Sequence, residues 1–228
     1  MKTMKTGIST KTLVLAAILT ALVVILQFMG AFIRFGPFSI SLVLIPIVIG
    51  AATCGVGVST WLGFAFGVVV LMSGDAAAFM VVNVAGTVLT VLVKGTAAGF
   101  LAGFAYRGVL RLLDRISVRQ IQQIKAKSGL CENCEKGVLE FISRNNKYIA
   151  VLVAAVVCPV VNTGVFLLGC LAFFMETIGQ WAAGAGLGGN VGHYMIFVLV
   201  GANFLFELAF NIILSPVVVR IVQAKKKI

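Results

Sequence analysis

Residues 40–72 read ISLVLIPIVIGAATCGVGVSTWLGFAFGVVVLM, a run of 33 residues without a charged side chain. A helix needs about 20 apolar residues to cross the hydrocarbon core of a bilayer, so this run is too long for one ordinary span. Gly55 and Gly57 interrupt it, and glycine is typical of a tight turn. We therefore expect two membrane-spanning helices, at 40–54 and 57–73, joined by a turn.

The composition of the whole chain also indicates a membrane protein. Hydrophobic residues make up 61% and charged residues only 11%, whereas about a quarter of the residues in a soluble domain are charged. Similar apolar runs predict an all-α integral membrane protein, a single domain over 1–228 built as a six-transmembrane-helix bundle. The expected spans are 10–33, 40–54, 57–73, 84–106, 148–175 and 194–222.

Basic residues gather in three segments of the chain. Of the 18 Lys and Arg residues, 16 lie in the N-terminal tail, in 107–147 or at the C-terminal end. Because Lys and Arg are enriched in cytoplasmic loops, we expect both termini on the cytoplasmic side and 107–147 as a cytoplasmic loop. This placement explains the net charge of +11 without a nucleic-acid partner, and it indicates a multi-pass protein of the plasma membrane in contact with lipids.

The 107–147 segment has two further features. Arg111, Arg115 and Arg119 recur every four residues, which predicts either an amphipathic extension near anionic headgroups or a solvated helix face. Cys131 and Cys134 have the spacing of a zinc-ligand pair, but a structural zinc site needs four ligands. Because the only histidine is expected across the membrane, we expect no bound metal and no cofactor.

Two charged residues lie within expected spans, where ionisable side chains are costly and mark functional sites. Lys94 is about ten residues into the fourth span, and Glu207 about 13 residues into the sixth, so both are expected near mid-depth. Two interpretations remain open. The residues form a structural ion pair, or Lys94 binds a substrate carboxylate while Glu207 positions it or accepts a hydrogen bond from the substrate.

Other polar residues point to a site on the outer side. Asn162 and Asn203 supply amides that both donate and accept hydrogen bonds, and Asn203 shares a helix face with Glu207, four residues later. Arg34 begins the first outer loop and Asn83 borders the second, so both are expected at the rim. The candidate substrate-binding residues are therefore Lys94, Glu207, Asn203, Asn162, Arg34 and Asn83.

Small residues every fourth position allow close contact between helices in lipid. The third span carries such a stripe from Gly55 to Gly67, which favours packing within the bundle. Ala17 and Ala21 in the first span form a shorter pair, which is expected either to pack in the bundle or to offer a flat docking face to another membrane protein.

Several of these stretches resemble the substrate-binding S components of energy-coupling factor (ECF) vitamin transporters. The similar features are LAAILTAL at 15–22, IPIVIG at 45–50 and the glycine stripe of the third span. Pro159-Val-Val-Asn162-Thr163 resembles the Asn-Thr signature of the pantothenate-type branch.

The resemblance implies a six-helix bundle that captures a vitamin from outside with high affinity, with pantothenate favoured and riboflavin, folate or a queuosine precursor as alternatives. It also implies that the Ala17 and Ala21 face docks onto a transmembrane scaffold (T) subunit driven by two cytoplasmic ATPase subunits. The sequence has no Gly-x-x-x-x-Gly-Lys-Ser/Thr phosphate-binding loop. This fits a binding subunit whose partners hydrolyse ATP.

Two other classes of protein fit less well. A self-sufficient secondary transporter or small channel is expected to have inverted repeats with broken helices in corresponding positions, and the break near Gly55 has no clear counterpart in the second half. A membrane enzyme acting on lipid needs a nucleophile or metal motif. Because no paired carboxylates, Ser/His/Asp set or His-containing metal motif lies at a common depth, we expect no enzymatic activity.

Overall fold

Helices make up nearly all of the computed structural model, which describes residues 9–31, 34–35, 38–39, 42–128 and 132–225. Two strands of two residues each, β1 (Arg34–Phe35) and β2 (Phe38–Ser39), pair antiparallel in the first outer connection. The predicted all-helical class is therefore confirmed apart from this short pair. The helices are α1 (Thr10–Ala31), α2 (Leu44–Thr53), α3 (Val56–Met72), α4 (Ala77–Met80), α5 (Val84–Ser128), α6 (Glu132–Phe173), α7 (Met175–Gly184), α8 (Val191–His193), the π-helix η1 (Tyr194–Gly201) and α9 (Ala202–Lys225).

Four stretches of the described chain are long and apolar enough to cross a membrane. They are Thr10–Gly30, Val84–Gln123, Gly137–Phe173 and Val191–Ala224. The other two predicted spans correspond to shorter apolar helices, α2 and α3. α3 follows the predicted 57–73 closely, but α2 has only 10 residues and is therefore about 15 Å long, half the thickness of a hydrocarbon core.

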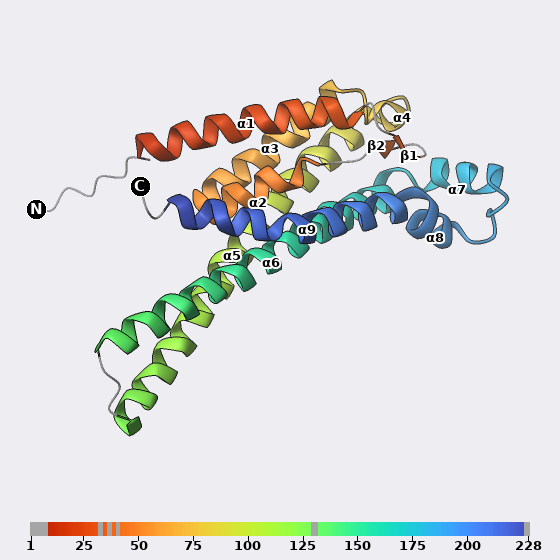
Figure 1. Cartoon of the computed structure of the whole chain (residues 1–228). Helices are drawn as coiled ribbons and strands as arrows, with labels where there is room; N and C mark the ends of the chain where they lie inside the picture. The colour runs from red at the N-terminus through yellow and green to blue at the C-terminus, as the bar shows by residue number, and fades with distance from the viewer. Residues whose placement is uncertain (1–8, 32–33, 36–37, 40–41, 129–131, 226–228) are drawn as a thin grey trace, which may run out of the picture.

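The short helix α2 lies at the centre of the bundle. It contacts α1, α3, α5, α6 and α9, and it buries Leu44 and every residue from Pro46 to Ala51, as expected for a helix that is apolar all round. Pro46 falls in its first turn, where a missing N–H breaks no helical hydrogen bond. In Figure 1, α1, α3 and α9 continue past α2 toward α4 and α7, so α2 fills only one half of the bundle.

A tight turn joins α2 to α3, at the glycine break predicted from the sequence. Gly55 has a φ of +97°, a conformation that side chains with a Cβ rarely adopt. A Cβ at Gly55 would also collide with the guanidinium of Arg107. The turn therefore requires glycine for its backbone conformation, whereas the flexible end of the Arg107 side chain could move away from a Cβ.

α3 and α5 touch backbone to backbone. A Cβ added to Gly63 would collide with the carbonyl of Gly95, and one added to Gly99 would collide with the carbonyl of Ser59. The small-residue stripe of the third span is thus an internal packing surface, as predicted. Its partner is a second stripe on α5 that the sequence analysis did not use, Gly95, Gly99 and Gly103.

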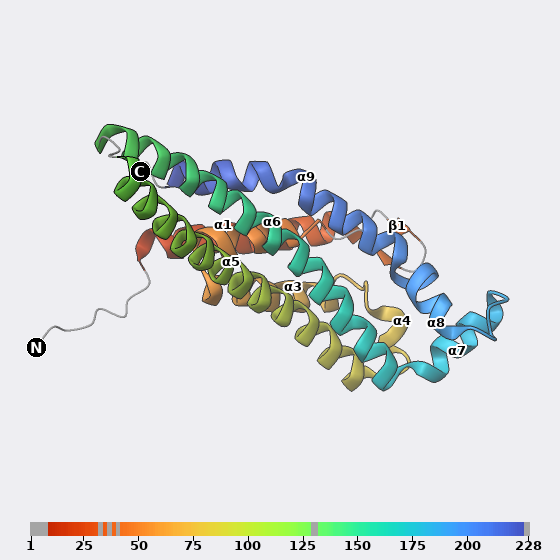
Figure 2. The same cartoon turned by 90° about the horizontal axis from the view of Figure 1, so that it is seen from below.

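The segment 107–147, predicted as a loop, is a helical hairpin. α5 continues to Ser128 and α6 begins at Glu132, and Figures 1 and 2 show the two helices side by side beyond the other helices. Residues 107–128 contain mostly Arg, Leu, Ile, Gln and Lys and no proline, so nothing in this stretch ends a helix. Hydropathy marks where the chain leaves an apolar environment, whereas the helix itself ends later.

A buried amide holds the helical hairpin together. Asn146 Nδ2 donates hydrogen bonds to Asp114 Oδ1 at 2.9 Å and to Ser117 Oγ at 3.1 Å. Because Asn146 is only 6% exposed, these bonds favour one register of α6 against α5. Of the predicted zinc-like pair, Cys131 lies outside the described residues, and Cys134 belongs to the first turn of α6.

The glycine-rich outer connection 176–193, expected to hold little helix, is partly helical. α7 forms because few glycines precede Ala183. Ile178 and Ala182 lie one turn apart and are buried, so this side of α7 packs against the protein. The stretch without helix is limited to residues 185–190. α7 therefore covers one end of the bundle as a packed helix.

The contact between α3 and α5 predicts a strong effect of one added methyl group. Gly99→Ala is expected to destabilise the protein by about 1–3 kcal/mol, because α3 must move away from the new Cβ. Thermal unfolding in detergent, followed by circular dichroism, measures this loss. The control is Gly164→Ala on α6, where a Cβ meets nothing within 4 Å and stability is expected to hold or rise slightly. Equal melting temperatures for the two variants would contradict the packing described here.

Candidate functional site

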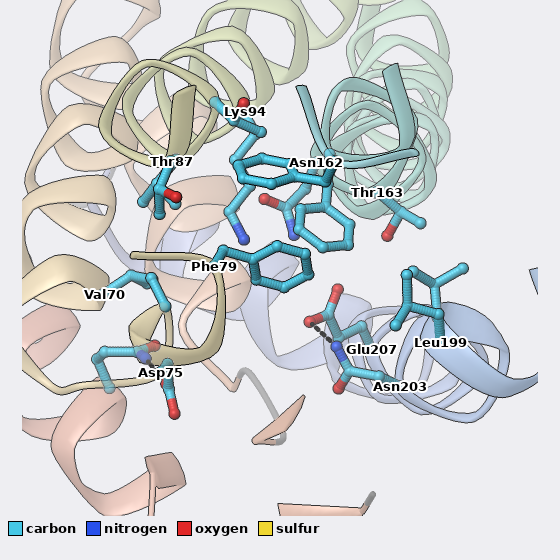
Figure 3. A pocket seen from close by; sticks show the side chains of 17 residues that line it. Val70, Asp75, Phe79, Thr87, Lys94, Asn162, Thr163, Leu199, Asn203 and Glu207 are labelled. Atoms are coloured by element: carbon cyan, nitrogen blue, oxygen red, sulfur yellow. Dashed lines mark hydrogen bonds between the residues drawn. The ribbon is translucent and has the colours of Figure 1, made fainter. Parts of the chain in front are cut away.

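A cavity of about 70 Å³ lies in the half of the bundle that α2 leaves unfilled. Its walls come from α1, α3, α5, α6, η1 and α9, together with the α3–α4 connection and α4. No residue of α2 lines it. Four of the predicted site residues line this one cavity, Lys94, Asn162, Asn203 and Glu207, and Figure 3 shows them around it.

Lys94 enters the cavity from α5. Its Nζ lies 5.1 Å from the centroid of the Phe166 ring and 5.8 Å from that of Phe66, distances at which a cation is attracted to an aromatic face. Figure 3 shows the amino group pointing into the cavity beside Asn162. The rings hold the side chain in place and leave its N–H groups directed at the cavity.

Glu207 faces Lys94 from α9 and is only 1% exposed. Asn203 Nδ2 donates to Glu207 Oε1 at 3.1 Å, so the predicted helix-face pair is present. Asn211, one turn further, donates from Nδ2 to the backbone carbonyl of Glu207 at 2.8 Å, a local bond that serves the helix. The preceding π-helix η1 contributes two consecutive wall residues, Leu199 and Val200, and π-helical turns are frequent at functional sites.

Three buried oxygen atoms in the cavity wall, one hydroxyl that can donate or accept and two amide oxygens, have no hydrogen-bond partner within the described part of the protein. They are Thr90 Oγ1, Asn162 Oδ1 and Asn203 Oδ1. Buried polar atoms are normally hydrogen-bonded, and an amide oxygen only accepts. The cavity is therefore built to receive a molecule that carries N–H or O–H donors.

A second polar group lies where α1 meets the α3–α4 connection. Gln27, which is 2% exposed, donates from Nε2 to Asp75 Oδ2 and, at 3.5 Å, to Ser73 Oγ. Gln27 and Asp75 both line the cavity, and the sequence analysis assigned neither to the site. The available signal was Gln27 itself, a long amide within an otherwise apolar span.

Aromatic rings cover the cavity. The Phe79 ring on α4 lies 5.7 Å from that of Phe166, 4.9 Å from that of Phe174 and 5.4 Å from that of Trp181, all edge-on. Phe79, Phe166 and Phe174 line the cavity. Because Trp181 belongs to α7, this cluster fastens α7 and α4 over the site. Phe79 was not predicted as a site residue, because a single aromatic in a short connection carries no signal in the sequence.

The other predicted residues have different positions. Asn83 does not line it; its Oδ1 accepts a hydrogen bond from the Gly86 N–H at 2.9 Å, so it caps the start of α5. Arg34 stands in β1, and its side chain lies outside the described structure. Ala17 and Ala21 are exposed on α1. Within the described residues, no three His, Cys, Asp or Glu side chains are grouped to hold a metal ion.

Comparison with known proteins gives the family of the chain. The family model of the ECF transporter substrate-specific component matches residues 11–221, which include every helix that lines the cavity. No curated protein and no solved structure matches the chain. A multi-pass helical membrane protein with a cavity lined by polar side chains agrees with that match. The chain belongs to the family of ECF transporter substrate-specific components, which implies a small-molecule substrate and the T and ATPase partners of such transporters.

Proposed function

We propose that this protein captures a vitamin from outside the cell, with pantothenate as the favoured substrate. It delivers the vitamin to the cytoplasm without chemical change, together with a T subunit and two ATPases. One observation carries the proposal: Lys94, Asn162, Asn203 and Glu207, from three different helices, line a single buried cavity. A cation, two amides and a carboxylate provide complementary contacts for a polar molecule with one anionic group.

Pantothenate matches this set of groups. Its carboxylate suits Lys94, and its two hydroxyls and amide N–H suit the acceptors of Asn162 and Asn203. Its geminal methyl groups suit the apolar wall that includes Leu199. Riboflavin, folate and queuosine precursors carry fused rings. A cavity of about 70 Å³, room for roughly five waters, favours the more compact molecule, and even pantothenate requires α4 and α7 to move outward.

The arrangement of the helices supports six passes through the plasma membrane. In Figure 1, α1, α3, α5, α6 and the α8–α9 stretch run between two ends of the molecule, and α2 runs opposite to α1 and α3 over part of that length. The start of α1, the end of α9 and the helical hairpin lie toward one end, and the exposed arginines of α5 belong to that hairpin. Because basic segments stay in the cytoplasm, the cavity end faces outside.

The substrate proposal predicts that pantothenate co-purifies with the protein and is released on denaturation, as detected by mass spectrometry.

Lys94→Ala is expected to weaken binding of pantothenate at least tenfold in calorimetry, about 1.4 kcal/mol, since the carboxylate loses its cation. Lys147→Ala, which changes another partly buried lysine outside the cavity, is the matched control. Unchanged affinity in folded Lys94→Ala would remove Lys94 from the site, and uptake driven by an ion gradient with the purified chain alone would indicate a secondary transporter.

The unpartnered acceptor of Asn162 predicts opposite effects on binding and stability. Asn162→Leu removes a buried polar atom that has no protein partner, so the free energy of unfolding measured without substrate is expected to stay the same or rise by about 1 kcal/mol. Binding of pantothenate is expected to fall at least tenfold. Asn211→Leu is the control, because it deletes a satisfied hydrogen bond and is expected to lower stability by about 1 kcal/mol. If Asn162→Leu is the less stable of the two, Asn162 serves the fold.

The exposed Ala17 and Ala21 face predicts the docking surface for the T subunit. Replacing both residues with Leu is expected to abolish co-purification with a co-expressed T subunit while pantothenate still binds, because bulky side chains keep the helices apart. Leu at Ala202 and Ala209, which are exposed alanines of α9, serves as the control and is expected to leave assembly intact. Normal assembly of the Ala17 and Ala21 variant would show that docking uses another surface.

A further inference from the structure

The helical hairpin carries a surface that transport of a vitamin does not explain. Where α5 extends beyond the bundle, most of its surface is exposed, and one face combines cations with large apolar side chains; Leu112 is 59% exposed and Ile116 is 43% exposed. The opposite side of α5 carries Ser117, which binds Asn146 of α6, and the buried Ile121. This basic face consists of Arg111, Leu112, Arg115, Ile116 and Arg119, all exposed.

The basic face continues the lipid-facing side of the same helix. Within the apolar part of α5, Phe100 is 47% exposed and Phe104 is 63% exposed. Residues seven and eleven positions apart return to nearly the same side of a helix, so Phe104 is followed along one line by Arg111 and Arg115. α5 is continuous over this distance. The side that faces acyl chains in the bilayer therefore becomes the basic face at the level of the headgroups.

The residue types of the basic face indicate what it binds. Large apolar side chains gain nothing from exposure to water, and arginines interleaved with them are typical of helices that lie against anionic membranes. The acidic residue nearest to this face, Asp114, is exposed at its edge, one helical turn from Arg111, and its Oδ1 accepts a hydrogen bond from Asn146 of α6. Long arginine side chains also reach back toward headgroups from beyond the end of the span.

We propose that the basic face binds anionic phospholipid headgroups of the cytoplasmic leaflet and holds the helical hairpin against the membrane surface. Figure 1 shows α5 and α6 running obliquely to the other long helices, so that the hairpin leaves the bundle to one side. The proposal uses the membrane orientation inferred above and is independent of the identity of the vitamin. A protein partner on the same face is the competing occupant.

A tryptophan placed in the basic face tests the proposal. The full-length Ile116→Trp variant is reconstituted into vesicles of phosphatidylcholine and phosphatidylglycerol, with bromine on the acyl chains of one lipid at a time. Fluorescence of the two natural tryptophans, measured in the unmodified chain, is subtracted. We expect quenching by brominated phosphatidylglycerol at least twice as strong as by brominated phosphatidylcholine, and this preference is expected to disappear at high salt.

Charge and depth variants serve as matched controls. In the Ile116→Trp background, Arg111→Gln, Arg115→Gln and Arg119→Gln together are expected to abolish the preference for phosphatidylglycerol, whereas Lys at the same three positions preserves it. Gln123→Trp, exposed and about 10 Å further along the same face, is expected to be quenched less. Equal quenching by the two lipids would overturn the proposal. So would the absence of quenching at position 116, which would indicate a face in water or against a protein.

Discussion

The short central helix α2 is the constraint on which the rest of the structure depends. It has 10 residues, about 15 Å of length in a hydrocarbon core of about 30 Å. The helices around it run the full length of the bundle, so they enclose a core that α2 fills at one end only. The other end becomes a cavity lined by Lys94, Asn162 and Glu207. A full-length helix at this position would fill this cavity.

Glycine contacts then fix the walls of that cavity. Gly63 and Gly95 bring the backbones of α3 and α5 together, and this close approach sets Phe66 of α3 beside Lys94 of α5. On the other side, Gly169 of α6 leaves room for Thr90. The position of the buried cation therefore depends on residues that have no side chain. The glycine contact that packs α3 against α5 thus also sets the position of Lys94 in the cavity.

The sequence predicted the features that depend on polarity and missed those that depend on where helices end. Lys94 and Glu207 were recognisable because charges are costly within apolar spans. The length of α2 was not recognisable, because residues 40–43 are mostly as apolar as the helix that follows. The spacing of Arg111, Arg115 and Arg119 predicted a helical extension, but the full length of the hairpin was missed because hydropathy falls at the membrane surface while helix propensity continues. Gln27 stands out as an amide within an apolar span, whereas Phe79 lies in a segment of unremarkable composition and only the fold brings it to the cavity.

The buried acceptors explain how one cavity serves both affinity and release. Each unpaired buried polar atom costs about 1–3 kcal/mol, and Thr90, Asn162 and Asn203 each contribute one. A substrate that supplies donors removes this cost as it binds, so the affinity arises from atoms that destabilise the protein alone. The same atoms make affinity sensitive to small displacements, because hydrogen bonds weaken steeply with misalignment. In the proposed function, a shift of α5 against α6 and α9 would misalign these hydrogen bonds and lower the affinity for the substrate.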